Sequence, residues 1–186
     1  SMDKTKAAWP QYTLRKSKDF DKFRRPRLVV TCALAHGYCC DFYLAEDETM
    51  FHGASTFCEI LIRTVARVAE LSETRGLTFP THLFVQSDNT TSQAKNAEVA
   101  QLLAVLVRKF KFKTVTLNFL RVGHTHEDVD AMFALILCLV LRRHKFQRPC
   151  ELKALIEAEM AEVAESRGES LNVELLSHIR DFQGQE

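Results

Sequence analysis

Segments with the apolar pattern of β-strands alternate along this chain with segments in which apolar residues recur at helical spacing. The order of these segments limits the folds that the chain can adopt. Residues 27–35 and 38–45 are rich in Val, Leu, Cys, Phe and Tyr and are separated by His36 and Gly37, which predicts a hairpin of two antiparallel strands. From Ser55 the apolar residues recur at helical spacing. The chain therefore changes from strand pairing to a long amphipathic helix early in its sequence, and Gly76 is placed to end that helix.

The alternation continues through the rest of the chain. A short apolar run at residues 82–85 predicts a buried strand that ends at Ser87, Asp88 and Asn89. Because a helical crossover places the next strand parallel to an earlier one, this order predicts an α/β fold with a mixed sheet flanked by helices. The later elements are predicted as a helix capped near Ser92, a strand at 112–120, a largely apolar helix at 126–143, a helix from Pro149 to near Gly168, and a short helix at 171–182.

The size and composition of the chain fit a single globular unit. Its 186 residues are 46% hydrophobic and 26% charged, which allows a sizeable core and argues against disorder. We expect the main domain at residues 1–145 and a C-terminal helical extension at residues 146–186 that packs on it. The longest apolar run, at residues 131–141, is too short to cross a bilayer, no signal peptide is visible, and the six cysteines form no C-x-x-C pair. These features predict an intracellular protein, in a compartment such as the nucleus, without a membrane partner.

The residues that could carry chemistry gather at two places in the sequence. Between His124 and Asp130 the chain has two histidines and three carboxylates, at the start of the apolar helix. Upstream, Asp88 follows the strand at residues 82–85. Ligands of open α/β sheets collect at the carboxyl ends of the strands, so the fold is expected to bring these places together if the strands run the same way. Carboxylates and imidazoles held together in this manner are typical of a divalent-metal site.

Each of these residues also has a purely structural interpretation. Thr125, with Asp128 three residues later, is an ordinary N-terminal capping box, and the helix dipole favours acids there. Asp88 lies in a string suited to an Asx turn, and His124 could simply hydrogen-bond a backbone carbonyl. Asp130 is harder to explain in this way, because it lies beyond the first turn among apolar residues, where an unpaired carboxylate is costly to bury.

Positive charge is concentrated in patches, although the net charge is only +1. Residues 1–27 hold nine Lys or Arg against three Asp, and residues 142–148 hold four Lys or Arg. The small net charge excludes a uniformly basic nucleic-acid binder. The patches could follow a phosphate backbone, or they could be solvated faces and helix-terminal charges. The residues singled out as phosphate contacts are Arg24, Arg25, Arg142 and Arg143.

Three separated motifs carry a resemblance to a known family. They are the segment from Ser1 to Lys6, Asp88-Asn89-Thr90 with Lys95-Asn96, and Gly123-His124-Thr125-His126 with Asp130. In order and spacing they resemble a ribonuclease H-like domain family, related to integrases and transposases, that occurs in eukaryotic mobile elements and is abundant in dinoflagellate proteins. The resemblance covers about residues 1–145.

The resemblance implies a ribonuclease H-like fold in which acids from the first strand, the fourth strand and a later helix hold two Mg²⁺ or Mn²⁺ ions. By this resemblance Asp3 lies at the end of the first strand and Asp88 is the acid of the fourth strand. Asp130 fills the third position together with His124 or His126.

The same family motifs include residues suited to binding nucleic acid. Lys95 is expected to contact a phosphate, and Asn89 and Asn96 either join it or fix the loop through backbone hydrogen bonds. The chain also departs from the family pattern. Relatives carry another acidic residue just before the position of Ser1, so the resemblance implies that the first strand is clipped and the catalytic set is incomplete.

Three functions are compatible with these residues. The first is a metal-dependent nuclease or strand-transfer domain acting on nucleic acid, DNA rather than RNA. The second is a module that keeps the fold and binds nucleic acid or protein without catalysis, which the small net charge and the missing acid favour. The third is a structural zinc domain using His124, His126 and cysteines, although no ligand spacing matches such a site. The sequence marks no interface between copies of the chain.

Overall fold

The computed structural model describes residues 2–8, 27–46, 53–87, 97–110, 112–119 and 128–180, and for residues 2–8 it describes the backbone alone. Strands and helices alternate along these residues, with one π-helical segment. In chain order they are β1 (Met2–Ala8), β2 (Arg27–Ala35), β3 (Cys39–Glu46), α1 (Ala54–Thr74), β4 (His82–Ser87), α2 (Ala97–Phe110), β5 (Thr114–Phe119), α3 (Asp128–Leu135), the π-helical η2 (Ile136–Leu141), α4 (Pro149–Ser166) and β6 (Ser170–Leu175).

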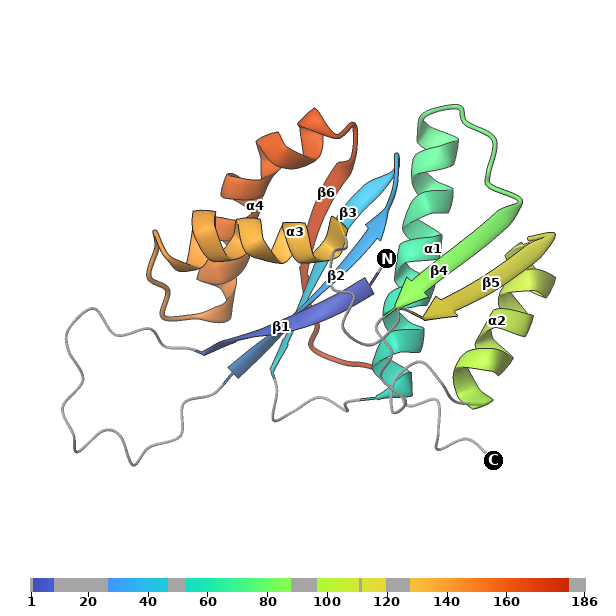
Figure 1. The fold of residues 1–186 in the computed structure, drawn as a ribbon, viewed down its shortest axis with the longest axis horizontal. Coiled ribbons are helices and arrows are strands. Elements are labelled where there is room, and N and C mark those ends of the chain that lie inside the picture. The colour runs from blue at the N-terminus through green and yellow to red at the C-terminus, as the bar shows by residue number, and fades with distance from the viewer. Residues whose placement is uncertain are drawn as a thin grey trace.

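The strands form one mixed sheet in the order β5-β4-β1-β2-β3-β6 (Figure 1). β2 is antiparallel to both of its neighbours, β1 and β3. The pairs β1 and β4, β4 and β5, and β3 and β6 are parallel. Within the described sheet, β2 therefore runs against all the other strands. Helices connect the parallel strands, as parallel pairing requires.

The β2–β3 hairpin lies in the interior of the sheet and is covered on both faces. Residues 28–34 of β2 and 39–45 of β3 are all buried. A strand buried on both faces has no solvent-facing side to occupy with polar residues, which explains why these runs are almost continuously apolar rather than alternating.

Two helical layers, one on each face of the sheet, enclose two hydrophobic cores (Figure 1). The first core joins α1 and α2 to the sheet through residues such as Leu61, Val65 and Val85. The second joins α3, η2 and α4 to the other face through residues such as Met132 and Ile156. Side chains alternate along β3, so that its odd-numbered residues face the α1 layer and its even-numbered residues face the α3 and α4 layer.

The predicted mixed α/β sheet with helices on its faces is confirmed. The hairpin, the long helix and the strand after it are observed within a few residues of their predicted bounds. Gly76 lies just beyond α1 with φ of 65°, a left-handed conformation that glycine adopts without steric cost. The cap predicted near Ser92 lies outside the described residues.

One prediction from the sequence is wrong, and another is confirmed only in part. The segment predicted as a last helix instead forms β6, which pairs in parallel with β3 and extends the sheet. Its apolar residues Leu171, Val173 and Leu175 alternate with polar ones, as in a strand. The helix predicted at residues 126–143 is α-helical only to Leu135, after which Arg142 N–H donates to the carbonyl of Leu137, five residues back, at 3.0 Å.

None of the helices in the described ranges combines the length and the apolar character that are needed to span a bilayer.

Candidate functional site

The backbone brings the first and fourth strands together at one end of β4. Ser87, the last residue of β4, pairs in parallel with Met2 of β1. Asp3 is the next residue of β1, near the amino end of that strand, and it pairs with Cys32 of β2. Asp88 follows Ser87 in the sequence but lies outside the described residues. The carboxyl end of β4 is therefore beside the part of β1 that carries Asp3.

Helix α3 lies against this same part of the sheet. It contacts both β1 and β2. Its buried residues Val129 and Met132 share a core cluster with Cys32, the β2 residue that pairs with Asp3. Asp130 lies between them on α3 and is half-buried. Two of the predicted metal-binding residues, Asp3 and Asp130, thus belong to elements that pack on one another.

Several predicted site residues lie outside the described part of the chain, so the roles predicted for them stay predictions. They are Arg24, Arg25, Asp88, Asn89, Lys95, Asn96, His124 and His126.

The side chains that the structure describes contain no group of three His, Cys, Asp or Glu residues that could hold a metal ion. This set does not include the side chains of Asp3 and Asp88, nor His124 and His126. A group built from the predicted ligands therefore stays a prediction.

The first residue of α3 reaches the hairpin turn. Asp128 Oδ2 lies 3.7 Å from Nε2 of His36, and both side chains are exposed. An exposed ion pair of this length contributes little to stability. Asp128 thus has a local partner of its own, in contrast to Asp130 two residues later, for which no ion pair is observed within the described residues.

Arg142 and Arg143 follow η2 with exposed side chains. They lie twelve and thirteen residues beyond Asp130 along α3 and η2, which corresponds to roughly 18 Å of helix or slightly more. At that distance they could bind a flanking phosphate of a long ligand, but not the phosphate at a site centred on Asp130.

A buried polar row on β3 was not foreseen from the sequence. It consists of Cys39, Asp41 and Tyr43, which face α1 from the interior of the sheet. Asp41 is completely buried, and burial raises the pKa of its carboxyl from 3.8 to about 6. The Tyr43 hydroxyl donates to Asp41 Oδ2 at 3.4 Å, whereas Asp41 Oδ1 is buried with no hydrogen-bond partner within the described residues. An acid inside an otherwise apolar strand was the signal that could have identified it.

Arg67 on α1 is a cation whose charge acts on this row. Its charge acts against the effect of burial on the pKa of Asp41. Its guanidinium donates from Nη2 to Ser170 Oγ of β6 and from Nη1 to Glu70 Oε2, both at 3.1 Å. Arg67 Nε is buried and has no partner within the described residues. The row is therefore an incompletely satisfied polar site inside the domain.

A second buried acid, Glu59, is fully paired. Its two oxygens accept from Arg63 Nε and Arg180 Nε, each at 2.7 Å. Burial alone would raise the pKa of Glu59, but the hydrogen bonds from Arg180 and Arg63 outweigh it and lower the pKa. Arg63 also pairs with Glu174 of β6. This network ties α1 to the end of the described chain and is structural in character.

The buried cysteines of β2 and α1 behave as core residues. A hydrogen bond with Cys40 and burial raise the pKa of Cys32, and burial raises the pKa of Cys58 to about 11. A zinc ligand must lose its proton, so raised pKa values disfavour these thiols as ligands. The zinc alternative thus gains no support from them.

The sheet and its two helical layers define a mixed α/β domain. Over residues 18–185 the chain matches a family model described as a domain of unknown function, DUF7869. The chain belongs to this family. No curated protein and no solved structure was found to match it.

Proposed function

We propose that this domain cleaves or transfers phosphodiester bonds of a nucleic acid, DNA rather than RNA, with Mg²⁺ or Mn²⁺ as cofactor. The observation that carries the proposal is the parallel pairing of Met2 with Ser87. The next residues in the sequence, Asp3 and Asp88, are two of the three acids expected to hold the metal. The third, Asp130, is on α3, which contacts β1.

The element order supports a ribonuclease H-like fold. A strand, a hairpin, a helix, a strand, a second helix and a strand follow one another from β1 to β5. A site that needs acids from the first and fourth strands requires those strands to be neighbours, and β1 and β4 are adjacent and parallel.

The donor set suits hard divalent cations, because Mg²⁺ and Mn²⁺ prefer carboxylate oxygens. Asp3, Asp88 and Asp130 would hold the ions. When bound, a pair of such ions activates the attacking oxygen and stabilises the leaving oxygen of a phosphodiester. His124 or His126 would exchange a proton near the reacting phosphate, and Lys95 would bind an adjacent one.

A non-catalytic nucleic-acid-binding module is the second candidate. The observations that favour it are the net charge of +1 and the position of Arg142 and Arg143 on a surface about 18 Å along the helix from Asp130. Such a module would bind through phosphate contacts alone, and its affinity would fall with salt but not with chelator.

The test measures Mn²⁺ binding by calorimetry and cleavage of labelled DNA and RNA, for the parent chain and for Asp88→Asn and Asp130→Asn. Asp128→Asn is the matched control, because Asp128 is an exposed acid on the same helix. We expect both site variants to lose Mn²⁺ binding and cleavage by at least about 100-fold, and the control to keep both. Equal Mn²⁺ binding by all four proteins would refute the metal site, and binding of DNA that ignores both chelator and Asp88→Asn would favour the second candidate.

A further inference from the structure

The described helices cover strands β4 and β5 on one face only. The odd-numbered apolar residues of these strands, such as Leu83, Val85 and Val115, pack in the core with α1 and α2. Successive side chains of a strand point to opposite faces, so the even-numbered residues lie on the face that α3 and α4 cover elsewhere in the sheet. Those two helices contact β1, β2, β3 and β6 (Figure 1). The even-numbered face of β4 and β5, called the open face below, is therefore left to solvent by the described helices.

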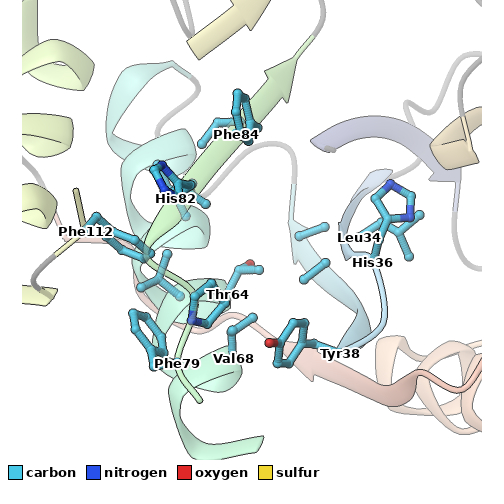
Figure 2. Close-up of a pocket in the computed structure, with 16 residues that line it drawn as sticks. Leu34, His36, Tyr38, Thr64, Val68, Phe79, His82, Phe84 and Phe112 are labelled. Atoms are coloured by element: carbon cyan, nitrogen blue, oxygen red, sulfur yellow. The ribbon is translucent and has the colours of Figure 1, made fainter. Parts of the chain in front are cut away.

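One aromatic side chain stands at the centre of the open face. Phe84 is 68% exposed and pairs with Thr116 of β5. Figure 2 shows Phe84 and His82 on β4, beside a cavity of about 320 Å³ that separates them from Leu34 and His36. The Phe84 ring thus borders open space rather than a packed core. The other even-numbered residues of the open face all carry hydrogen-bonding groups: His82, Gln86, Thr114, Thr116 and Asn118.

The open face suits a nucleobase better than the surface of another protein. The buried centre of a protein interface is apolar and extended, whereas Phe84 is a single large apolar side chain among polar ones. A nucleobase has a π-face that stacks on an aromatic ring and edges that form hydrogen bonds. Bases in a duplex already stack on their neighbours, so the exposed ring fits an unpaired base.

The charges near the open face also allow a phosphate backbone to approach. Neither β4 nor β5 contains an Asp or Glu. Lys113 directly precedes β5 and its side chain is exposed. Its backbone N–H donates to the carbonyl of Thr81 at 2.7 Å, which fixes Lys113 at the amino ends of both strands. A lysine in this position can bind a phosphate without a competing carboxylate on either strand.

We propose that the open face of β4 and β5 binds a single-stranded segment of nucleic acid, with one base stacked on Phe84. Asn118 hydrogen-bonds a base edge, and Lys113 binds a phosphate. Ser87, the last residue of β4, is three residues beyond Phe84, which corresponds to roughly 10 Å of strand, and Asp88 is the next residue in the sequence. The inference rests on the proposed function and specifies its substrate: the strand is unpaired within a few nucleotides of the phosphate that reacts.

The test measures binding of fluorescently labelled single-stranded DNA by anisotropy, in EDTA, so that a metal contributes nothing. We expect Phe84→Ala to weaken binding by roughly 5- to 100-fold and Asn118→Ala by about 2- to 10-fold. Val105→Ala is the matched control, because Val105 is an exposed apolar residue on α2, in the layer on the other face of the sheet. It should leave the affinity unchanged. Since Phe84 is exposed, Phe84→Ala should also leave Tm nearly unchanged.

Two more substitutions separate stacking from simple apolar contact. Phe84→Tyr keeps the π-face and should keep the affinity within about twofold, whereas Phe84→Leu should weaken binding as Phe84→Ala does. Full affinity of the leucine or alanine variant would overturn the proposal. So would self-association of the parent chain that Phe84→Ala abolishes, without binding of single-stranded DNA, because the open face would then belong to a protein partner.

The outcome can be separated from that of the proposed function. Asp130→Asn should lose cleavage but keep its binding of single-stranded DNA in EDTA. A parent chain that binds through Phe84 and cleaves nothing would refute the proposed function alone. Cleavage that depends on Asp130, together with binding that Phe84→Ala does not change, would refute this inference alone.

Discussion

Asp41 offers a prediction whose size follows from the structure. Its carboxyl is completely buried on β3, and its pKa is raised by burial from 3.8 to about 6. Between these two values the folded protein keeps the proton that the unfolded chain releases. Stability is therefore lost as pH rises through this window, and the loss is complete above about pH 6. A shift of about two pKa units corresponds to roughly 3 kcal/mol.

The perturbation is Asp41→Asn, which keeps the shape of the side chain and removes its titration. The amide can still accept from Tyr43, whose hydroxyl lies 3.4 Å from Asp41 Oδ2. Burying the amide has a fixed cost that does not change with pH. The useful quantity is thus the change in ΔΔG of unfolding between about pH 4.5 and about pH 7.5, which the titration predicts to be about 2 kcal/mol in favour of the variant.

The assay is urea unfolding of the parent chain and the variant at both pH values. Glu162→Gln on α4 is the control, because Glu162 is exposed and no ion pair is observed for it within the described residues, so its replacement should change the free energy of unfolding little. If the free-energy difference between parent and Asp41→Asn is the same at both pH values, Asp41 is not a buried, titrating acid and the reasoning fails.

Two further predictions concern structural contacts. Glu59→Gln removes the charge shared by Arg63 and Arg180, and we expect urea unfolding to show a loss of about 1 to 3 kcal/mol; an unchanged midpoint would contradict the observed pairing. Gly168→Ala should lower the free energy of unfolding by about 1 kcal/mol, because φ of 69° at Gly168 disfavours a side chain. Steric contact adds nothing to this, since no atom lies within 4 Å of the new Cβ. Ala164→Gly, in the last turn of α4, tests the opposite change in backbone freedom. A thermal shift near zero for Gly168→Ala would show that this turn relaxes freely.

Most of the elements that were predicted correctly were predicted from the local spacing of apolar residues. The hairpin around Gly37 and the helix that ends before Gly76 follow from adjacent residues, and both are observed. The segment from Leu171 to Leu175 was misjudged although its apolar residues alternate with polar ones, because this alternation is short and the partner strand β3 lies more than a hundred residues earlier. Parallel pairing of distant segments leaves no local signal, so only the family resemblance, and not periodicity, pointed to the neighbourhood of Met2 and Ser87.

The candidate site was only partly accessible from the sequence. Asp88 and Asp130 could be identified by their positions after a strand and near the start of a helix, whereas Asp3 was singled out only by the family resemblance. Asp41 escaped notice because it lies in an apolar run, where a single acid gives no periodic pattern. Its importance comes from complete burial and from an oxygen without a partner among the described residues, and both depend on packing.

β6 is synthesised long after β3, its partner in the sheet, and this delay affects folding of the domain during translation. β6 supplies the outer neighbour of β3, yet Ser170 is synthesised 124 residues after Glu46, the last residue of β3. At about 5 to 20 residues per second, that interval lasts roughly 6 to 25 s. During translation, β3 of the nascent hairpin therefore exposes an unpaired edge until β6 is made. In that interval the edge could pair with strands of other proteins.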